Sequence, residues 1–116
     1  MADLRLNVKK IIEINNCNNC RFDTETIITT MNCRNSEFEA NKCVLIHNCN
    51  WSRFIIDNIT KMTECNNCEF VYTKWQNKIT GNHFINGCVF KLHKNADIEF
   101  DKMLINGKNN QCELYN

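Results

Sequence analysis

The sequence contains no proline and only three glycines, Gly81, Gly87 and Gly107, so it lacks the residues that mark flexible or turn-rich linkers between domains. It lacks an apolar run long enough to cross a membrane, and its first residues lack the apolar stretch of a signal peptide. The formal net charge of +1 gives no general attraction toward nucleic acid or an anionic membrane surface. We therefore expect a single domain in the cytoplasm or another reducing compartment, and we disfavour nucleic acid and membranes as partners.

Cysteine and asparagine are abundant instead. Nine cysteines make an odd number, which fits poorly with a closed set of disulfides, so we expect reduced thiols. The frequent Asn, Ile and Lys indicate the codon bias of an AT-rich genome, such as some viral genomes, and carry no information about activity.

A repeat of sixteen residues runs through residues 7–70. Its clearest marker is a column of phenylalanines, one in each unit, at Phe22, Phe38, Phe54 and Phe70. Cysteines keep the same interval at Cys17, Cys33, Cys49 and Cys65. A fixed period of this kind means that one structural unit is stacked on copies of itself.

The unit predicts strands rather than helices. Positions six and eight of each unit, and positions fourteen and sixteen, suggest alternation with a period of two and include β-branched residues. Sixteen residues are too few for helical or leucine-rich repeats. We therefore predict an all-β fold, a single-domain β-solenoid resembling a parallel β-helix, in which each coil adds one rung to parallel sheets.

The expected boundaries follow from where the repeat holds. Residues 1–6 are expected to form a cap, residues 7–70 four regular sixteen-residue coils, and residues 71–116 irregular and wider coils. The C-x-F ending returns at Cys88 to Phe90 and again, as C-x-L, at Cys112 to Leu114. The longer spacings predict insertions near 71–78 and 91–98. Asparagines just before the cysteine column are expected to turn each coil, since Asn tolerates left-handed backbone.

The fifteenth position of each unit carries a charge whose sign alternates. These residues are Arg21, Glu37, Arg53 and Glu69. Stacked neighbours lie about 4.8 Å apart, and at that distance opposite charges stabilise by roughly 0.2–1 kcal/mol per pair. The alternation supports the register and makes these four residues interface candidates; the alternative is a solvated face whose order is accidental.

Two C-N-N-C motifs, Cys17 to Cys20 and Cys65 to Cys68, have the spacing of half a zinc site. In the repeat they lie three rungs apart, about 14 Å, whereas Zn–S bonds are about 2.3 Å long. Core packing is therefore the favoured interpretation, and no cofactor is expected. A zinc site formed by these four cysteines is the first alternative, and redox or disulfide chemistry is the second.

Few other residues point to chemistry. Trp51 stands where the other units have Asn, so it should point outward, either as a contact anchor or as an ordinary exposed aromatic. Cys88 with His83 or His93 could form a nucleophile pair, although surface histidines would look the same. The sequence has no P-loop, dinucleotide or G-x-S-x-G motif.

These observations favour a non-enzymatic structural protein. The predicted partner is protein: the chain itself, as a homo-oligomer or filament, or a larger assembly on which this rigid repeat subunit docks. Open ends of a solenoid present unpaired strand edges that invite further strands. The alternative is a zinc-binding, cysteine-rich module that recognises nucleic acid.

Overall fold

The computed structural model describes residues 5–72, 84–93 and 107–115, and all the regular structure in this part of the chain is strand. The strands are β1 (Arg5–Asn7), β2 (Lys10–Asn15), β3 (Arg21–Asp23), β4 (Thr26–Met31), β5 (Glu37–His47), β6 (Arg53–Thr63), β7 (Glu69–Tyr72), β8 (Val89–His93) and β9 (Gln111–Tyr115). They belong to one nine-stranded sheet in which every pairing is parallel. Among these residues no helix is long and apolar enough to span a membrane.

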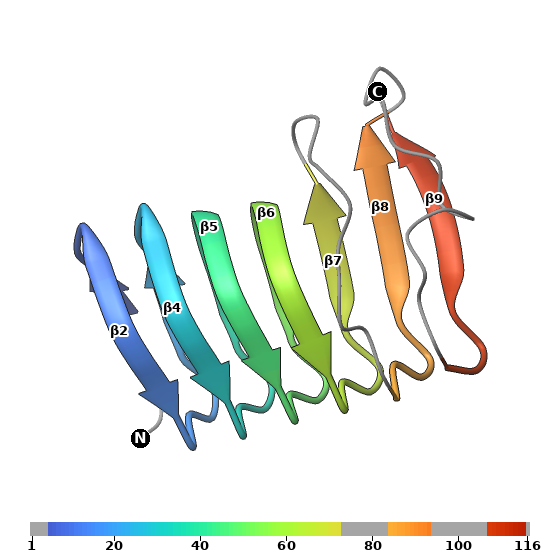
Figure 1. Cartoon of the computed structure of the whole chain (residues 1–116), viewed down its shortest axis with the longest axis horizontal. Helices are drawn as coiled ribbons and strands as arrows, with labels where there is room; N and C mark the ends of the chain where they lie inside the picture. The colour runs from blue at the N-terminus through green and yellow to red at the C-terminus, as the bar shows by residue number, and fades with distance from the viewer. Residues whose placement is uncertain (1–4, 73–83, 94–106, 116) are drawn as a thin grey trace.

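Successive coils lie directly on one another, as Figure 1 shows for the row from β2 to β9. The ladder pairs Phe22 with Phe38, Phe38 with Phe54, and Phe54 with Phe70, which is the sixteen-residue interval of the sequence. The predicted all-β solenoid is therefore confirmed. Of the expected cap at 1–6, the structure describes residues 5 and 6, which begin β1 and pair with β3.

The register after Phe70 differs in part from the expectation. Phe90 pairs with Phe70, twenty residues on, as the C-x-F ending predicts. The expected alignment of the C-x-L ending with the C-x-F ending is wrong, because Cys112 and not Leu114 pairs with Phe90. Leu114 pairs with Leu92 instead, which keeps an apolar residue in the next inward column. Of the expected insertions, 73–78 and 94–98 lie outside the described residues, while 71–72 and 91–93 belong to β7 and β8.

Inward-facing side chains recur every three residues around most of a coil and every two residues near the phenylalanine. In the third coil they are Ala40, Cys43, Ile46, Cys49, Ser52 and Phe54. The expected alternation at positions six and eight is wrong at position six, where Ile12 is 63% exposed. The ladder passes from the Ile11–Ile27 pair directly to the Glu13–Thr29 pair, so the strand bends there and position five faces inward.

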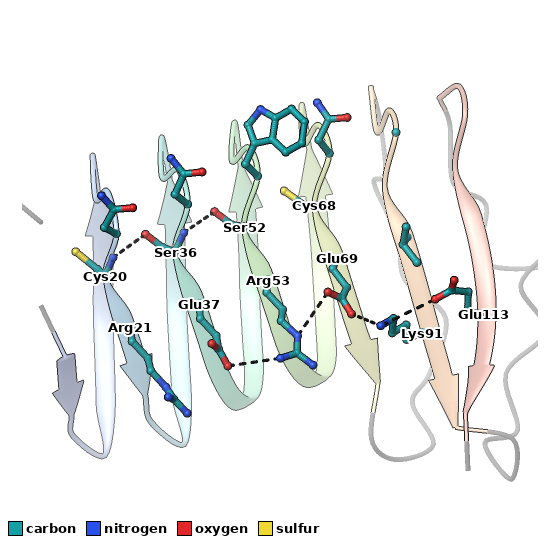
Figure 2. A pocket seen from close by; sticks show the side chains of 16 residues that line it. Cys20, Arg21, Ser36, Glu37, Ser52, Arg53, Cys68, Glu69, Lys91 and Glu113 are labelled. Atoms are coloured by element: carbon teal, nitrogen blue, oxygen red, sulfur yellow. Dashed lines mark hydrogen bonds and ion pairs between the residues drawn. The ribbon is translucent and has the colours of Figure 1, made fainter. Parts of the chain in front are cut away.

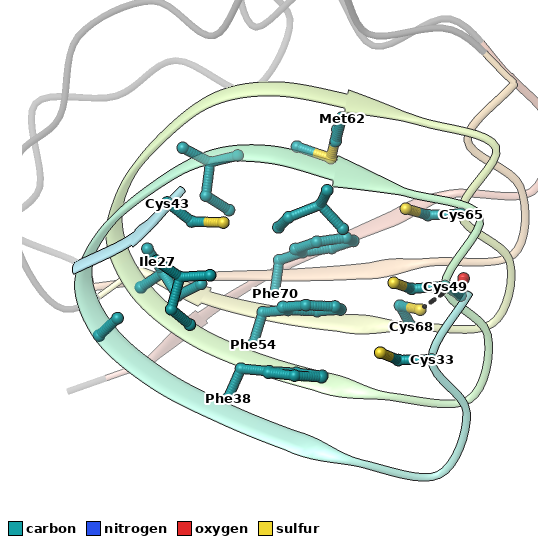
Figure 3. Close-up of a cluster of buried hydrophobic side chains, with 14 of the residues drawn as sticks. Ile27, Cys33, Phe38, Cys43, Cys49, Phe54, Met62, Cys65, Cys68 and Phe70 are labelled. Atoms are coloured by element: carbon teal, nitrogen blue, oxygen red, sulfur yellow. Dashed lines mark hydrogen bonds between the residues drawn. The ribbon is translucent and has the colours of Figure 1, made fainter. Parts of the chain in front are cut away.

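The phenylalanine column forms a continuous stack through the core (Figure 3). Neighbouring ring centroids lie 4.9–5.3 Å apart with interplanar angles of 3–13°, from Phe22 to Phe90. Each aromatic pair contributes about 0.5–1.5 kcal/mol beyond the burial of its area. The column therefore stabilises the register as well as filling the core.

Two left-handed residues turn every regular coil. The first turn position holds Asn16, Asn32, Asn48 and Glu64, and the second holds Asn19, Asn35, Trp51 and Asn67; φ at these residues lies between 52° and 59°. The expectation that the asparagines before the cysteine column turn the chain is confirmed. Their amides also link coils, as in the bond of 2.8 Å that Asn48 Nδ2 donates to Asn32 Oδ1.

Candidate functional site

A shallow groove with a volume of about 1110 Å³ runs along the stack, beside the second turn of each coil. Three parallel columns line it: the left-handed turn residues, the buried Cys/Ser column and the charged column. Figure 2 shows the charged and Cys/Ser residues following one another from strand to strand. The groove therefore crosses the coils instead of lying within one of them.

The floor of the groove is built by the Cys/Ser column. The Ser36 hydroxyl accepts a hydrogen bond of 3.1 Å from the backbone N–H of Cys20 (Figure 2). Ser52 accepts one of 3.3 Å from the N–H of Ser36. In the last coil the Asn110 side-chain oxygen does the same for the N–H of Cys88, at 3.0 Å. A small side chain with an acceptor atom is therefore useful at this position, which explains why serine replaces cysteine there.

One rim of the groove is a chain of alternating charges. Arg53 lies 4.0 Å from Glu37 and 3.6 Å from Glu69, measured between side-chain nitrogen and oxygen atoms. Lys91 lies 2.7 Å from Glu69 and 4.0 Å from Glu113 (Figure 2). The hydrogen bond to Glu69 raises the pKa of the Lys91 ammonium group. The rim is thus charge-compensated along its length.

The alternation predicted from the sequence holds for the rungs from Glu37 to Glu69. Arg21 is paired with Glu37 in the ladder, but the two side chains, both described, form no ion pair. Lys91 and Glu113 continue the rim, and the sequence reasoning missed them. Glu69 pairs with Val89 in the ladder, so Lys91 stands two residues further along its coil, and only the observed register reveals the contact.

The opposite rim carries the second turn residues, among them Trp51. Its side chain is 62% exposed and its backbone has φ of 55°. The outward direction expected from its place in the repeat is therefore observed. Bulky residues are rare in this left-handed region, whereas Asn and Gly adopt it readily. Gly87 holds the same turn in the fifth coil, with φ of 64°.

The four cysteines of the alternative zinc site all point into the core, where each is at most 3% exposed. Burial raises the pKa of the Cys17 and Cys65 thiols to about 12, which disfavours the thiolate that zinc requires. Within the described ranges no group of three or more His, Cys, Asp or Glu residues is placed to hold a metal ion. The pairs remain on separate coils, at residues 17–20 and 65–68.

The alternative nucleophile is also enclosed. Cys88 is fully buried, so its sulfur is not accessible to a substrate in this structure. Nothing is described of His83 or of the His93 side chain. His47, on the outer surface, shares a hydrogen bond of 2.6 Å with Thr63 and lies 3.7 Å from Glu64.

The two ends of the stack form a second kind of surface. Cys112 and Leu114 continue the inward columns of Phe90 and Leu92, yet both are exposed, Leu114 by 71%. No described coil covers them. At the other end Val8 begins the column that Leu114 ends, and it is 39% exposed. The hydrophobic core is thus open to solvent at the β9 end of the described stack, whereas at the β1 end Val8 is partly exposed and Ile14, Cys17 and Cys20 of the first coil are buried.

The described part of the chain therefore offers a groove along its side, an open core at the β9 end and a partly exposed Val8 at the β1 end. No protein-family model, curated protein or solved structure matches it, so similarity adds nothing to these surfaces.

Proposed function

We propose that this protein is a non-enzymatic assembly subunit that stacks end to end on further copies of itself. One observation carries the proposal: Leu114 occupies an inward column of the core and is 71% exposed. Burying such a side chain contributes roughly 1.5–3 kcal/mol. A further coil would cover it, and the chain itself has coils of the matching shape.

The register of the contact follows from the ladder. Asn7 stands in the column of Asp23, and Glu113 stands in the column of Lys91. A second copy added in the same parallel register would place its Val8 on Leu114 of the first. The backbone edges of β1 and β9 would pair in the same step, which is how open strand edges associate. A head-to-tail contact of this kind leaves a free end after every addition, so it builds filaments.

Paired end-blocking variants test this proposal. Val8→Asp places a carboxylate at the first coil, and Leu114→Asp places one at the last. Light scattering after size-exclusion chromatography, over a range of concentrations, should show association of the unaltered chain and a monomer for each variant alone. An equimolar mixture of the two variants should form dimers and nothing larger, because one intact end of each kind remains.

These measurements distinguish head-to-tail stacking from contact between identical ends and from the absence of self-assembly. If two identical ends met, one of the variants would dimerise alone, and the head-to-tail contact would be refuted. If the unaltered chain stayed monomeric at every concentration, self-assembly would be refuted, and docking on a different partner would replace it. Circular dichroism of both variants verifies that the solenoid is intact, since these side chains are already exposed in the monomer.

A further inference from the structure

We infer that the lateral groove binds a neutral oligosaccharide, with Trp51 as the residue on which a sugar ring stacks. The groove is separate from the ends of the stack, so the inference does not depend on assembly. It combines an exposed indole, side-chain amides and ion-paired carboxylates along one continuous channel. An aromatic face together with a few placed polar groups is the common composition of small-ligand sites.

Trp51 is the first reason to expect a ligand. The equivalent residues Asn19, Asn35 and Asn67 fit the left-handed turn, and Gly87 fits it in the fifth coil. A bulky side chain at φ of 55° strains the backbone, and its ring remains largely in solvent. Folding therefore does not account for tryptophan at this turn. A contact made by the exposed indole does account for it, since tryptophan dominates many binding sites.

The charge of the rim indicates what kind of ligand fits. Glu37, Arg53, Glu69, Lys91 and Glu113 are linked by successive ion pairs, so each charge already faces an opposite one. With Arg21 the rim carries three positive and three negative side chains. Single-stranded nucleic acids require a basic channel, and strongly anionic polymers would also meet carboxylates here. A neutral ligand that accepts and donates hydrogen bonds suits this rim.

The backbone excludes an added peptide strand. The turn N–H groups are bonded to the next coil, as Asn35 N–H is to Asn50 O at 3.3 Å and Trp51 N–H is to Asn66 O at 3.1 Å. The groove must therefore recognise its ligand through side chains. Its rungs repeat at 4.9–5.3 Å, measured between phenylalanine rings. An extended peptide presents same-face side chains about 6.6 Å apart, whereas a sugar ring spans a length similar to one rung.

Binding of three neutral hexasaccharides tests the inference. Cellohexaose, chitohexaose and maltohexaose are titrated into the unaltered protein by isothermal calorimetry, and at least one should bind. Trp51→Asn should weaken that binding by about tenfold or more. Asparagine fits this turn in three other coils, so the variant should keep its circular dichroism and its unfolding midpoint.

Phe84 provides the matched control. It is also an exposed aromatic at a left-handed turn, 68% exposed with φ of 57°, but it lies outside the groove lining. Phe84→Asn should leave sugar binding unchanged. The inference is overturned if none of the three sugars binds, or if Trp51→Asn and Phe84→Asn affect binding equally. It is also overturned if a sulfated hexasaccharide or a protein partner, and no neutral sugar, proves to bind in a Trp51-dependent way.

Discussion

Removing the Ser36 hydroxyl is the sharpest test of the ladder beneath the groove. In Ser36→Ala the buried N–H of Cys20 loses the oxygen that accepts it at 3.1 Å. An unsatisfied buried donor costs about 1–3 kcal/mol, and no longer burying the polar serine hydroxyl offsets only part of this. Arg34 O, which accepts from the Ser36 hydroxyl, still accepts from Asn19 N–H at 3.3 Å, so that carbonyl is not orphaned. We expect a net loss of about 1–2 kcal/mol.

The assay is equilibrium unfolding in urea followed by circular dichroism. Ser36→Ala should lower the unfolding midpoint without changing the slope, since the native surface is unaltered. Thr24→Val provides the opposite case, because the buried Thr24 hydroxyl has no hydrogen-bond partner among the described residues. Replacing it by a methyl group of similar volume should leave stability unchanged or raise it by about 0.5–1 kcal/mol.

The stability of the Ser36 variants decides whether the hydroxyl satisfies the N–H of Cys20. If Ser36→Ala were as stable as the unaltered chain, the hydroxyl would not be satisfying Cys20, and the explanation for serine in this column would be refuted. The stability of Ser36→Cys should lie between that of Ser36→Ala and that of the unaltered chain. Cysteine occupies the equivalent positions at Cys20, Cys68 and Cys88, and its sulfur is a weak acceptor.

Three further predictions concern thiols and the last coil. Eight cysteines are buried and Cys112 is exposed, so one thiol per chain should react rapidly with Ellman's reagent; several rapid thiols would contradict the core assignment. Burial raises the pKa of the Cys43 and Cys65 thiols to about 12, while unfolded thiols titrate near a pKa of about 8.5. Each protonated thiol contributes its full stabilisation below that lower value. As the pH rises from about 9 to about 12, the free energy of unfolding should fall by about 1.4 kcal/mol per pH unit for each such thiol. Unfolding midpoints that stay constant over this range would refute the prediction. In Gly107→Ala the new Cβ would overlap the backbone oxygen of Ile85, so hydrogen exchange should show β9 opening at a free energy lower by about 3 kcal/mol or more, and unchanged protection would contradict this packing.

The sequence was sufficient where the repeat is exact. Phe22 to Phe70 recur at a constant interval, and the ladder pairs them one to one. Because in-register parallel strands place equal positions on one another, the columns and the alternating rim followed from counting. The position of Trp51 outside the core followed in the same way.

The sequence was insufficient where the interval changes. The C-x-L at Cys112 resembled C-x-F, yet the side chain that replaces serine in that coil is Asn110, two residues earlier. The side-chain oxygen of Asn110 accepts the kind of hydrogen bond that serine accepts in other coils, but a comparison of residue types along the sequence does not identify it. The bend at Ile12 was missed because period-two alternation assumes a straight strand. Trp51 could be placed outward, but its left-handed φ could not be read from residue type.

The two proposed surfaces would act together on a polymeric ligand. A single groove that stacks one indole against one sugar ring is expected to bind weakly. Head-to-tail assembly would repeat that groove along the filament in a fixed orientation, since every added coil keeps the parallel register. Each further contact with the same chain of sugars would then be intramolecular, and avidity can exceed single-site affinity by a factor of about 10²–10⁴. A long neutral glycan should therefore distinguish filaments from end-blocked monomers, whereas a hexasaccharide should bind both alike.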